Sequence, residues 1–132
     1  MEKIVCDTNV FVSGFMYPGN ERRVVRMIYE GRVVNFTSNE LIIEFARVIK
    51  RRKFKLNESE QKKILKFFID ISELVEPKRR VDIIKDDPED NKVIECALES
   101  KANYIISGDK HLLGVKNYKG IKVLNAKKFL DI

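Results

Sequence analysis

One carboxylate in the sequence stands where an apolar side chain would be expected. Helical residues advance by about 100° each, and the segment that begins at Pro88 carries an apolar stripe formed by Val93, Ile94, Ala97 and Leu98. Asp90 falls in the middle of this stripe. An ionised carboxylate that faces the interior is unfavourable unless a partner or a metal ion compensates its charge. The alternative is that the helix dipole stabilises an acidic residue in the first turn, wherever its side chain points.

Two further aspartates follow short apolar runs of the kind that form buried parallel strands. Asp7 comes after residues 3–6, and Asp109 comes after residues 104–107 and Gly108. Open α/β sheets place their ligand crevice beyond the carboxyl ends of the strands, so we expect Asp7 and Asp109 to lie in converging surroundings. Aspartate is also a common turn residue at strand ends, which is the competing explanation for each of them alone.

A fourth acidic residue lies at the edge of another apolar helical face. The face is formed by Leu41, Phe45, Val48 and Ile49. Glu44 lies beside this face, whereas Glu40 points to the solvated side of the same helix. The competing explanation for Glu44 is a surface ion pair with Arg47, three residues later, which would contribute only a few tenths of a kcal/mol.

These acidic residues must be positioned by an alternation of strands and helices. Short apolar runs predict strands at residues 3–6, 33–36, 104–107 and 121–124. Capping signals predict helix starts at Thr37-Ser38-Asn39-Glu40, at Asn57 with Glu60, and at Asp87-Pro88. We expect these helices to run to about residues 50, 72 and 101, with further helices at 21–29 and 127–130. The pattern predicts an α/β fold with a central, mainly parallel sheet flanked by helices.

Length and composition indicate one globular domain over residues 1–132. The chain is 44% hydrophobic and 35% charged, which argues against disorder, and it has neither a spanning apolar run nor a signal-peptide layout. We therefore expect a cytoplasmic protein without a membrane segment. Cys6 and Cys96 are interpreted as buried small hydrophobic residues, since no CxxC pair is present. The net charge of +6 favours polyanionic partners, nucleic acid above all.

Four motifs make the sequence similar to a known family. They are Asp7-Thr8-Asn9, the segment Ser38 to Glu44 with Arg51-Arg52-Lys53-Phe54 at the end of its helix, Asp87-Pro88-Glu89-Asp90-Asn91, and Ser107-Gly108-Asp109-Lys110. In this order they resemble the PIN-domain family, and more narrowly its VapC-like branch of toxins from toxin-antitoxin pairs. The motifs span residues 7–112, so the resemblance covers nearly the whole chain.

The resemblance implies roles for individual residues. Asp7, Glu44, Asp90 and Asp109 would form an acidic, metal-binding and catalytic quartet. Asn9 and Ser107 would be neighbouring polar groups that orient ligands or substrate, and Asp87 would cap the helix that presents Asp90. Members of this branch usually carry an aspartate two residues after the last metal-site aspartate, where this chain has His111. We interpret His111 as a loop or structural residue rather than a general base, because a metal-activated water needs no histidine.

The chemistry expected of such a quartet is metal-dependent hydrolysis. Like charges a few ångströms apart cannot all stay ionised without a cation, and hard oxygen ligands select Mg²⁺ or Mn²⁺. By resemblance, the expected function is a ribonuclease, the toxin of a toxin-antitoxin pair. The sequence leaves the use of one or two ions open. The expected partners are RNA, an antitoxin protein and a second copy of the chain.

Other function classes remain open at this point. One is a non-catalytic RNA-binding or antitoxin-docking module. Such a module would be expected to lack one of the four acidic residues, and all four are present. Another is a constitutive RNA-processing nuclease. A phosphohydrolase of the haloacid-dehalogenase type is disfavoured, because that pattern requires a second aspartate where Asn9 stands.

Basic and apolar surface segments suggest where partners would bind. Basic clusters occur at Arg22, Arg23 and Arg26, at residues 50–53 and at residues 78–80. They could hold a phosphate backbone, or they could simply be solvated helix faces. We expect Lys110 and Arg51 to bind substrate. The segment Phe67-Phe68-Ile69 is unusually apolar for a surface helix, and any exposed part of it would suit a homodimer or an antitoxin segment.

Overall fold

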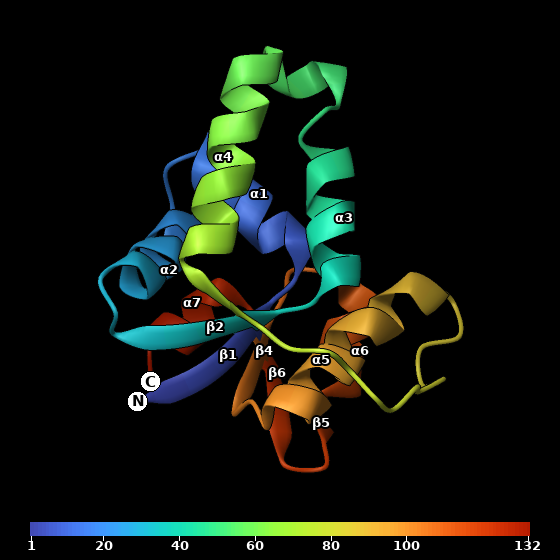
Figure 1. Ribbon diagram of the computed structural model, residues 1–132. Helices are drawn as coiled ribbons and strands as arrows, with labels where there is room; N and C mark the ends of the chain where they lie inside the picture. Colours follow the sequence, from blue (N-terminus) through green and yellow to red (C-terminus); the bar gives the residue numbers. More distant parts are fainter.

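A six-stranded sheet runs through the centre of the computed structural model, which describes residues 1–132 (Figure 1). The strands are β1 (Glu2–Cys6), β2 (Val33–Thr37), β3 (Ser72–Leu74), β4 (Tyr104–Ile106), β5 (Asn117–Tyr118) and β6 (Ile121–Leu124), in the order β3-β2-β1-β4-β6-β5. All neighbouring strands are parallel except β5 and β6. In the central pair, Ile4 lies opposite Tyr104 and Cys6 opposite Ile106, so β1 and β4 end at the same edge of the sheet.

Seven α-helices and two short 3₁₀ helices connect the strands. They are α1 (Thr8–Met16), α2 (Asn20–Tyr29), α3 (Asn39–Val48), η1 (Arg52–Phe54), α4 (Glu58–Asp70), η2 (Pro88–Asp90), α5 (Asn91–Ser100), α6 (Lys110–Val115) and α7 (Ala126–Leu130). Helices α3 and α4 form an antiparallel pair that projects away from the sheet (Figure 1). None of the helices combines the length and the apolar character that a membrane crossing requires.

The two faces of the sheet bury separate cores, because successive side chains of a strand point to opposite faces. Ile4 and Cys6 face a core built with α1, α2, α3, α4 and α7. In this core the ring centroid of Phe68 lies 4.6 Å from that of Phe11 and 4.4 Å from that of Phe45. Val5 faces the other core, which consists mainly of residues from α5, α6 and the neighbouring strands. Both faces are covered, as expected for parallel strands with continuous apolar sequences.

The predicted α/β class and its mainly parallel sheet are confirmed. All four predicted strands and all five predicted helices are present within a few residues of their expected ends. The predicted capping box of α4 is also present, with the Asn57 side chain accepting from the backbone N–H of Glu60 and the Glu60 carboxylate accepting from that of Asn57. The capping box predicted from Thr37 is wrong. Thr37 ends β2, and the Ser38 hydroxyl caps α3 by accepting from the Leu41 N–H.

Helix α1 was not expected from the sequence, because five of its nine residues are buried and it has no continuous polar face. It packs closely against α2. A Cβ atom added to Gly14 would lie 2.6 Å from Cγ2 of Val25 and 3.0 Å from the backbone oxygen of Glu21. Glycine at this position therefore allows the two helices their close approach.

The segment between β3 and η2 has no regular structure, yet it is fastened to α5. The buried carboxylate of Glu95 accepts hydrogen bonds from the Val81 backbone N–H and from the Arg80 guanidinium, each 2.9 Å long. Arg80 also pairs with Glu40 at the start of α3, at 2.7 Å. This segment leads directly into Asp86 and Asp87, so its attachment helps to fix where those carboxylates lie.

Candidate metal centre

Two adjacent parallel strands bring their terminal residues together at one edge of the sheet. The backbone N–H of Asp7, which follows β1, donates to the carbonyl of Ile106, the last residue of β4, at 2.9 Å. The Ser107 hydroxyl donates to Oδ2 of Asp7 at 2.9 Å and accepts from the backbone N–H of Asp109 at 2.9 Å. Asp7 and Ser107 are both buried. The convergence expected from the strand ends is therefore present, with Ser107 as the link between the two aspartates.

Asp109 is also the N-cap of α6. Its Oδ1 accepts from the backbone N–H groups of His111 at 2.7 Å and Leu112 at 3.3 Å. The cap turns the chain immediately after Asp109, so that His111 lies beside it. This N-cap is the signal in the sequence that would have predicted α6 and the position of His111.

A buried amide holds the turn that carries Asp87 and Asp90. The Asn91 side chain accepts from the backbone N–H groups of Ile83 and Ile84 and donates to the carbonyls of Ile84 and Pro88, at 2.9 to 3.0 Å. All its hydrogen-bonding groups are satisfied by the backbone of this turn. Asp87 stands at the N-cap position, as expected, but its side chain makes no capping hydrogen bond. The expected role of Asp87 as a side-chain cap is thus wrong, because its carboxylate lies in the acidic cluster instead.

Four side chains form that cluster: Asp87, Asp90, Asp109 and His111. One potential ligand atom from each lies within 4.8 Å of one from every other. All four side chains are half-buried. Sequence reasoning placed Asp90 and Asp109 at such a centre but gave Asp87 only a capping role and His111 only a structural one.

Burial and mutual repulsion dominate the electrostatics of this centre. The pKa of Asp90 is raised from the ordinary 3.8 to about 8, first by burial and then by the negative charges of Asp109, Asp7 and Asp87. The pKa of Asp7 is raised mainly by burial, and the nearby charge of Asp109 adds to the shift, while the hydrogen bond from Ser107 lowers it. Asp7 therefore belongs to the same electrostatic neighbourhood, although it lies outside the closest set of four.

Glu44 approaches the centre from α3. Its pKa is raised first by burial and then by the negative charge of Asp7. No ion pair with Arg47 is formed, so the surface pair considered as the alternative is absent. The structure thus brings Asp7, Asp90 and Asp109 together and places Glu44 within reach of the charge of Asp7, but not within the closest set.

The donor set fits a divalent cation. Oδ2 of Asp90 and Nδ1 of His111 are buried and have no hydrogen-bond partner, which is costly for polar atoms away from water. Three carboxylates converge, and none of them forms an ion pair with a lysine or an arginine. A cation would satisfy the unpartnered atoms and offset the repulsion, and oxygen-rich ligand sets suit Mg²⁺ and Mn²⁺.

A cleft of about 270 Å³ opens beside Asp109. It is lined by Asn9, Val10, Ser13, Glu21, Gly108 and Asp109. Asn9 is exposed there, and its role next to a substrate stays a prediction. Ser13 and Glu21 were not expected. The spacing of Asn9 and Ser13, four residues apart, would have placed them on one helical face if α1 had been recognised.

The basic residues are distributed unevenly around the centre. Lys110 is exposed and follows Asp109 directly, whereas Arg51 lies exposed at the far end of α3. Arg22 instead donates to the backbone carbonyls of Gly14 and Phe15, at 3.0 and 3.2 Å, and so holds the connection between α1 and α2. Arg80 is engaged by Glu40 and Glu95.

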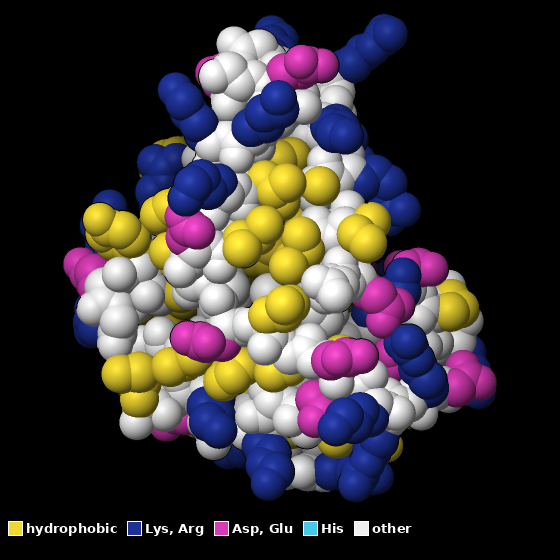
Figure 2. All heavy atoms as spheres, in the orientation of Figure 1, with side chains coloured by type: hydrophobic (Ala, Val, Ile, Leu, Met, Phe, Trp, Pro, Cys, Tyr) yellow, Lys and Arg dark blue, Asp and Glu magenta, His cyan; other side chains and the backbone are white.

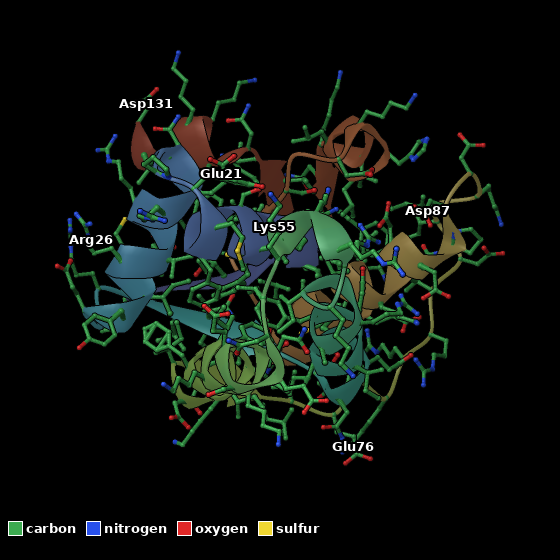
Figure 3. The ribbon with its side chains drawn as sticks, turned by 90° about the horizontal axis from the view of Figure 1, so that it is seen from above. Glu21, Arg26, Lys55, Glu76, Asp87 and Asp131 are labelled. Carbon is green, nitrogen blue, oxygen red and sulfur yellow. The ribbon has the colours of Figure 1, made fainter.

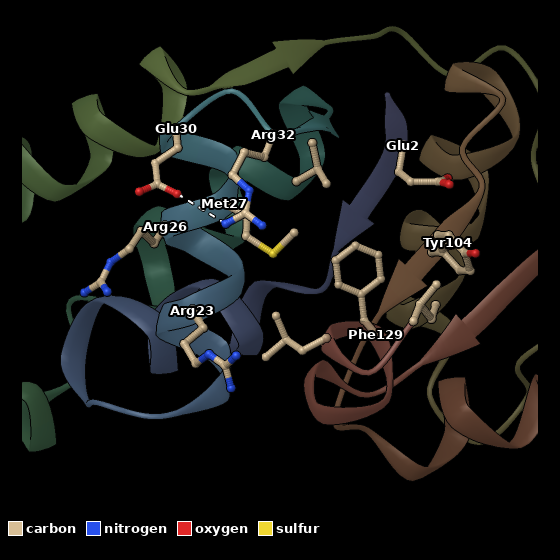
Figure 4. A pocket seen from close by; sticks show the side chains of 11 residues that line it. Glu2, Arg23, Arg26, Met27, Glu30, Arg32, Tyr104 and Phe129 are labelled. Carbon is tan, nitrogen blue, oxygen red and sulfur yellow. Dashed lines mark ion pairs between the residues drawn. The ribbon is translucent and has the colours of Figure 1, made fainter.

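The largest cavity, of about 500 Å³, lies at the opposite edge of the sheet (Figure 4). Its lining includes the first residues of β2 and β4, Val33 and Tyr104, and the α2 residues Arg23 and Arg26. Figure 3 shows Arg26 and Asp87 on opposite sides of the molecule. Arg23 and Arg26 therefore do not face the acidic cluster, and the cavity contains none of its residues.

Comparisons with known proteins agree with this arrangement. A family model described as PIN domain matches residues 3–111. The chain is 35% identical to the uncharacterized protein MJ1680 of Methanocaldococcus jannaschii, over 98% of this chain and 90% of that protein. It is also similar in structure to PAE2754 from Pyrobaculum aerophilum, with a TM-score of 0.63 over 99% of this chain and 88% of that chain. At 13% sequence identity, this second likeness concerns the fold alone.

Proposed function

Because the chain belongs to the PIN-domain family, whose members are typically metal-dependent nucleases, we propose that it is an endoribonuclease that uses Mg²⁺ or Mn²⁺. The observation that carries the proposal is the convergence of Asp7, Asp90 and Asp109 at one edge of the sheet, where their charges repel one another. We propose residues 1–132 as one such domain, acting in the cytoplasm.

In this proposal Asp7, Glu44, Asp90 and Asp109 are the catalytic residues and hold the cation. A bound divalent cation would lower the pKa of a water molecule and neutralise charge on the phosphate that the water attacks. The Ser107 hydroxyl holds the Asp7 carboxylate in one orientation through its 2.9 Å hydrogen bond. Asn91 fixes the turn that carries Asp87 and Asp90.

The substrate would enter along the cleft beside Asp109. Asn9 lines this cleft and would contact the RNA, while Lys110 and Arg51 would bind phosphates without reading bases. Attack of water on phosphorus breaks the bond to the 3′ oxygen, which takes up a proton. The products are then a 5′-phosphate and a 3′-hydroxyl.

The proposed biological role is that of a toxin controlled by an antitoxin protein, with a second copy of the chain as a further partner. Figure 2 shows hydrophobic side chains gathered between α3 and α4 and down to the sheet. Ile43, Ile69 and Leu74 are exposed large hydrophobic residues of these elements. Of the apolar segment 67–69, Phe68 is buried and Ile69 is exposed, so part of it is available to a partner.

The decisive experiment is cleavage of a panel of end-labelled RNAs by the purified protein with Mg²⁺, with Mn²⁺ and with chelator. Asp7→Asn is prepared in parallel, and Asp131→Asn is the matched control, because Asp131 is an exposed aspartate near the C-terminus. We expect metal-dependent cleavage by the wild type and by Asp131→Asn, with loss of cleavage in Asp7→Asn. Equal cleavage by all three proteins would show a contaminating nuclease.

A second candidate function is a PIN module that binds RNA or an antitoxin without cleaving. Without a bound cation, the raised pKa of Asp90 would leave its carboxyl group protonated at neutral pH. A centre that stays in this metal-free state would favour the module that does not cleave. RNA binding without cleavage of any member of the panel, in the presence of Mn²⁺, would support this module. Cleavage by a protein whose gene has no neighbouring antitoxin gene would instead favour constitutive RNA processing.

A further inference from the structure

We propose that His111 is a nitrogen ligand of the cation, through Nδ1, and that the centre therefore prefers Mn²⁺ to Mg²⁺. This inference rests on the proposed metal-dependent function and goes beyond it, because a purely acidic quartet would offer oxygen atoms alone. His111 is the only histidine of the chain, so it alone could add an imidazole nitrogen to the carboxylate oxygens.

The position of Nδ1 argues for this role. It is buried and has no hydrogen-bond partner, although the rest of the side chain is partly exposed. The nearest carboxylate oxygen, Oδ1 of Asp109, lies 3.6 Å away, too far for a hydrogen bond. That oxygen already accepts from two backbone N–H groups, those of His111 and Leu112. A purely structural histidine would be expected to have a partner for a buried ring nitrogen.

The other ring nitrogen faces a different carboxylate. Nε2 lies 3.9 Å from Oδ2 of Asp86, on the solvent side of the centre. When Nδ1 holds a cation, the proton of the neutral imidazole lies on Nε2, on the side of this carboxylate. The lone pair of the neutral imidazole is then on Nδ1, the atom that a metal requires.

The residues around His111 supply the other ligand atoms of the centre. His111 shares its cluster with Asp87, Asp90 and Asp109, and potential ligand atoms of all four lie within 4.8 Å of one another. The second unpartnered buried atom of this region, Oδ2 of Asp90, belongs to the same cluster. One cation would satisfy both atoms.

A mixed nitrogen and oxygen ligand set changes the choice of metal. Mg²⁺ is a hard ion that takes oxygen ligands and keeps several waters, whereas imidazole suits divalent transition metals. Loss of a group that only supports a ligand weakens metal binding by about 10- to 100-fold, so loss of a direct ligand should weaken it at least tenfold. Replacement of His111 by aspartate should restore an oxygen ligand and shift the preference back toward Mg²⁺.

The test is electron spin-echo spectroscopy of Mn²⁺ bound to the tag-free protein in a nitrogen-free buffer. A directly bound imidazole modulates the echo through its ¹⁴N nucleus, and His111 is the one histidine that could do so. We expect this modulation in the wild type and its absence in His111→Asn and His111→Asp. Titrations with Mn²⁺ and with Mg²⁺ should show that His111→Asp lowers the preference for Mn²⁺ by about tenfold or more.

The outcomes separate this inference from the proposed function. Mn²⁺ that binds the wild type without ¹⁴N modulation would overturn the role of His111 and leave the nuclease proposal standing. Absence of any Mn²⁺ binding would overturn both. Circular dichroism establishes that the variants are folded, and the wild-type spectrum is decisive even if they are not.

Discussion

The Ser107 hydroxyl donates a 2.9 Å hydrogen bond to Oδ2 of Asp7, a residue that lies 100 positions earlier in the chain. The same hydroxyl oxygen accepts from the backbone N–H of Asp109. One buried side chain therefore joins the acidic residues that follow the two central strands, and it does so with both its donor and its acceptor.

Replacement of Ser107 by alanine should impair the centre and the fold together. The change leaves Oδ2 of Asp7 without its donor, so we expect the free energy of unfolding to fall by about 1 to 3 kcal/mol. Mn²⁺ binding should weaken by about 10- to 100-fold, as for other groups that orient a ligand. Denaturant unfolding and Mn²⁺ titration measure the two effects. Ser100→Ala is the control, because Ser100 is also buried but bonds only to carbonyls within α5, and an equal loss of Mn²⁺ affinity there would contradict the prediction.

Replacement of Asp90 by asparagine should stabilise the protein in chelator and abolish its response to metal. Without metal, the Asp90 carboxyl must either take up a proton or carry a charge that Asp109, Asp7 and Asp87 repel; asparagine removes this cost, so the melting temperature without metal should rise. Added Mn²⁺ should raise the melting temperature of the wild type, since it binds the folded state, but not that of Asp90→Asn. Identical melting shifts in Asp90→Asn, Asp7→Asn and wild type would show that these residues do not share a metal site.

The stability of the metal-free protein should fall as the pH rises. Because the pKa of Asp90 is about 8 in the folded protein and 3.8 ordinarily, the folded state binds more protons than the unfolded state between these values. The free energy of unfolding therefore decreases with pH through this window, and the raised pKa of Asp7 acts in the same direction. Melting temperatures in chelator at about pH 5 and about pH 8 test the sign. Asp90→Asn should show a shallower dependence, and a slope equal to that of the wild type would contradict the assignment.

Two glycines should respond to alanine in opposite directions. At Gly14 the added methyl group meets Val25 and the backbone of Glu21, so α1 and α2 must separate, and we expect a loss of about 1 to 3 kcal/mol. Gly114 lies within α6 with open space around its Cβ position, so alanine there should be neutral or stabilising by up to about 1 kcal/mol. Thermal unfolding of both variants measures the difference. Equal effects would mean that the contact between α1 and α2 is not tight.

The sequence was sufficient to predict Asp7 and Asp109 as neighbours, because adjacent parallel strands end at one edge of a sheet. It also indicated Asp90, since a carboxylate in an apolar stripe must be compensated. The placement of Glu44 in the centre stays a prediction. His111 and Asp87 could not be placed in the cluster by periodicity, because their positions depend on two tight turns, capped by Asp109 and held by Asn91.

The fold was predictable where one face of an element is polar. Helix α1 was missed because it is buried on nearly all sides and shows no helical period in its polarity. Strands β3 and β5 were missed because three and two residues are too few to show alternation. Strands β3 and β5 are defined by the strands they pair with rather than by their own residues.

The placement of β1 between β2 and β4 has a consequence for the chain while it is being synthesised. A ribosome that has completed α5 has already produced Asp7, Glu44, Asp87, Asp90 and their helices, but neither Ser107 nor Asp109. The first strand then still lacks its partner on one side, and the Asp7 carboxylate lacks its hydrogen-bond donor. If the proposed ribonuclease function is correct, a nascent chain could not cut the messenger RNA from which it is being translated until Ser107 and Asp109 have left the ribosome and folded against β1.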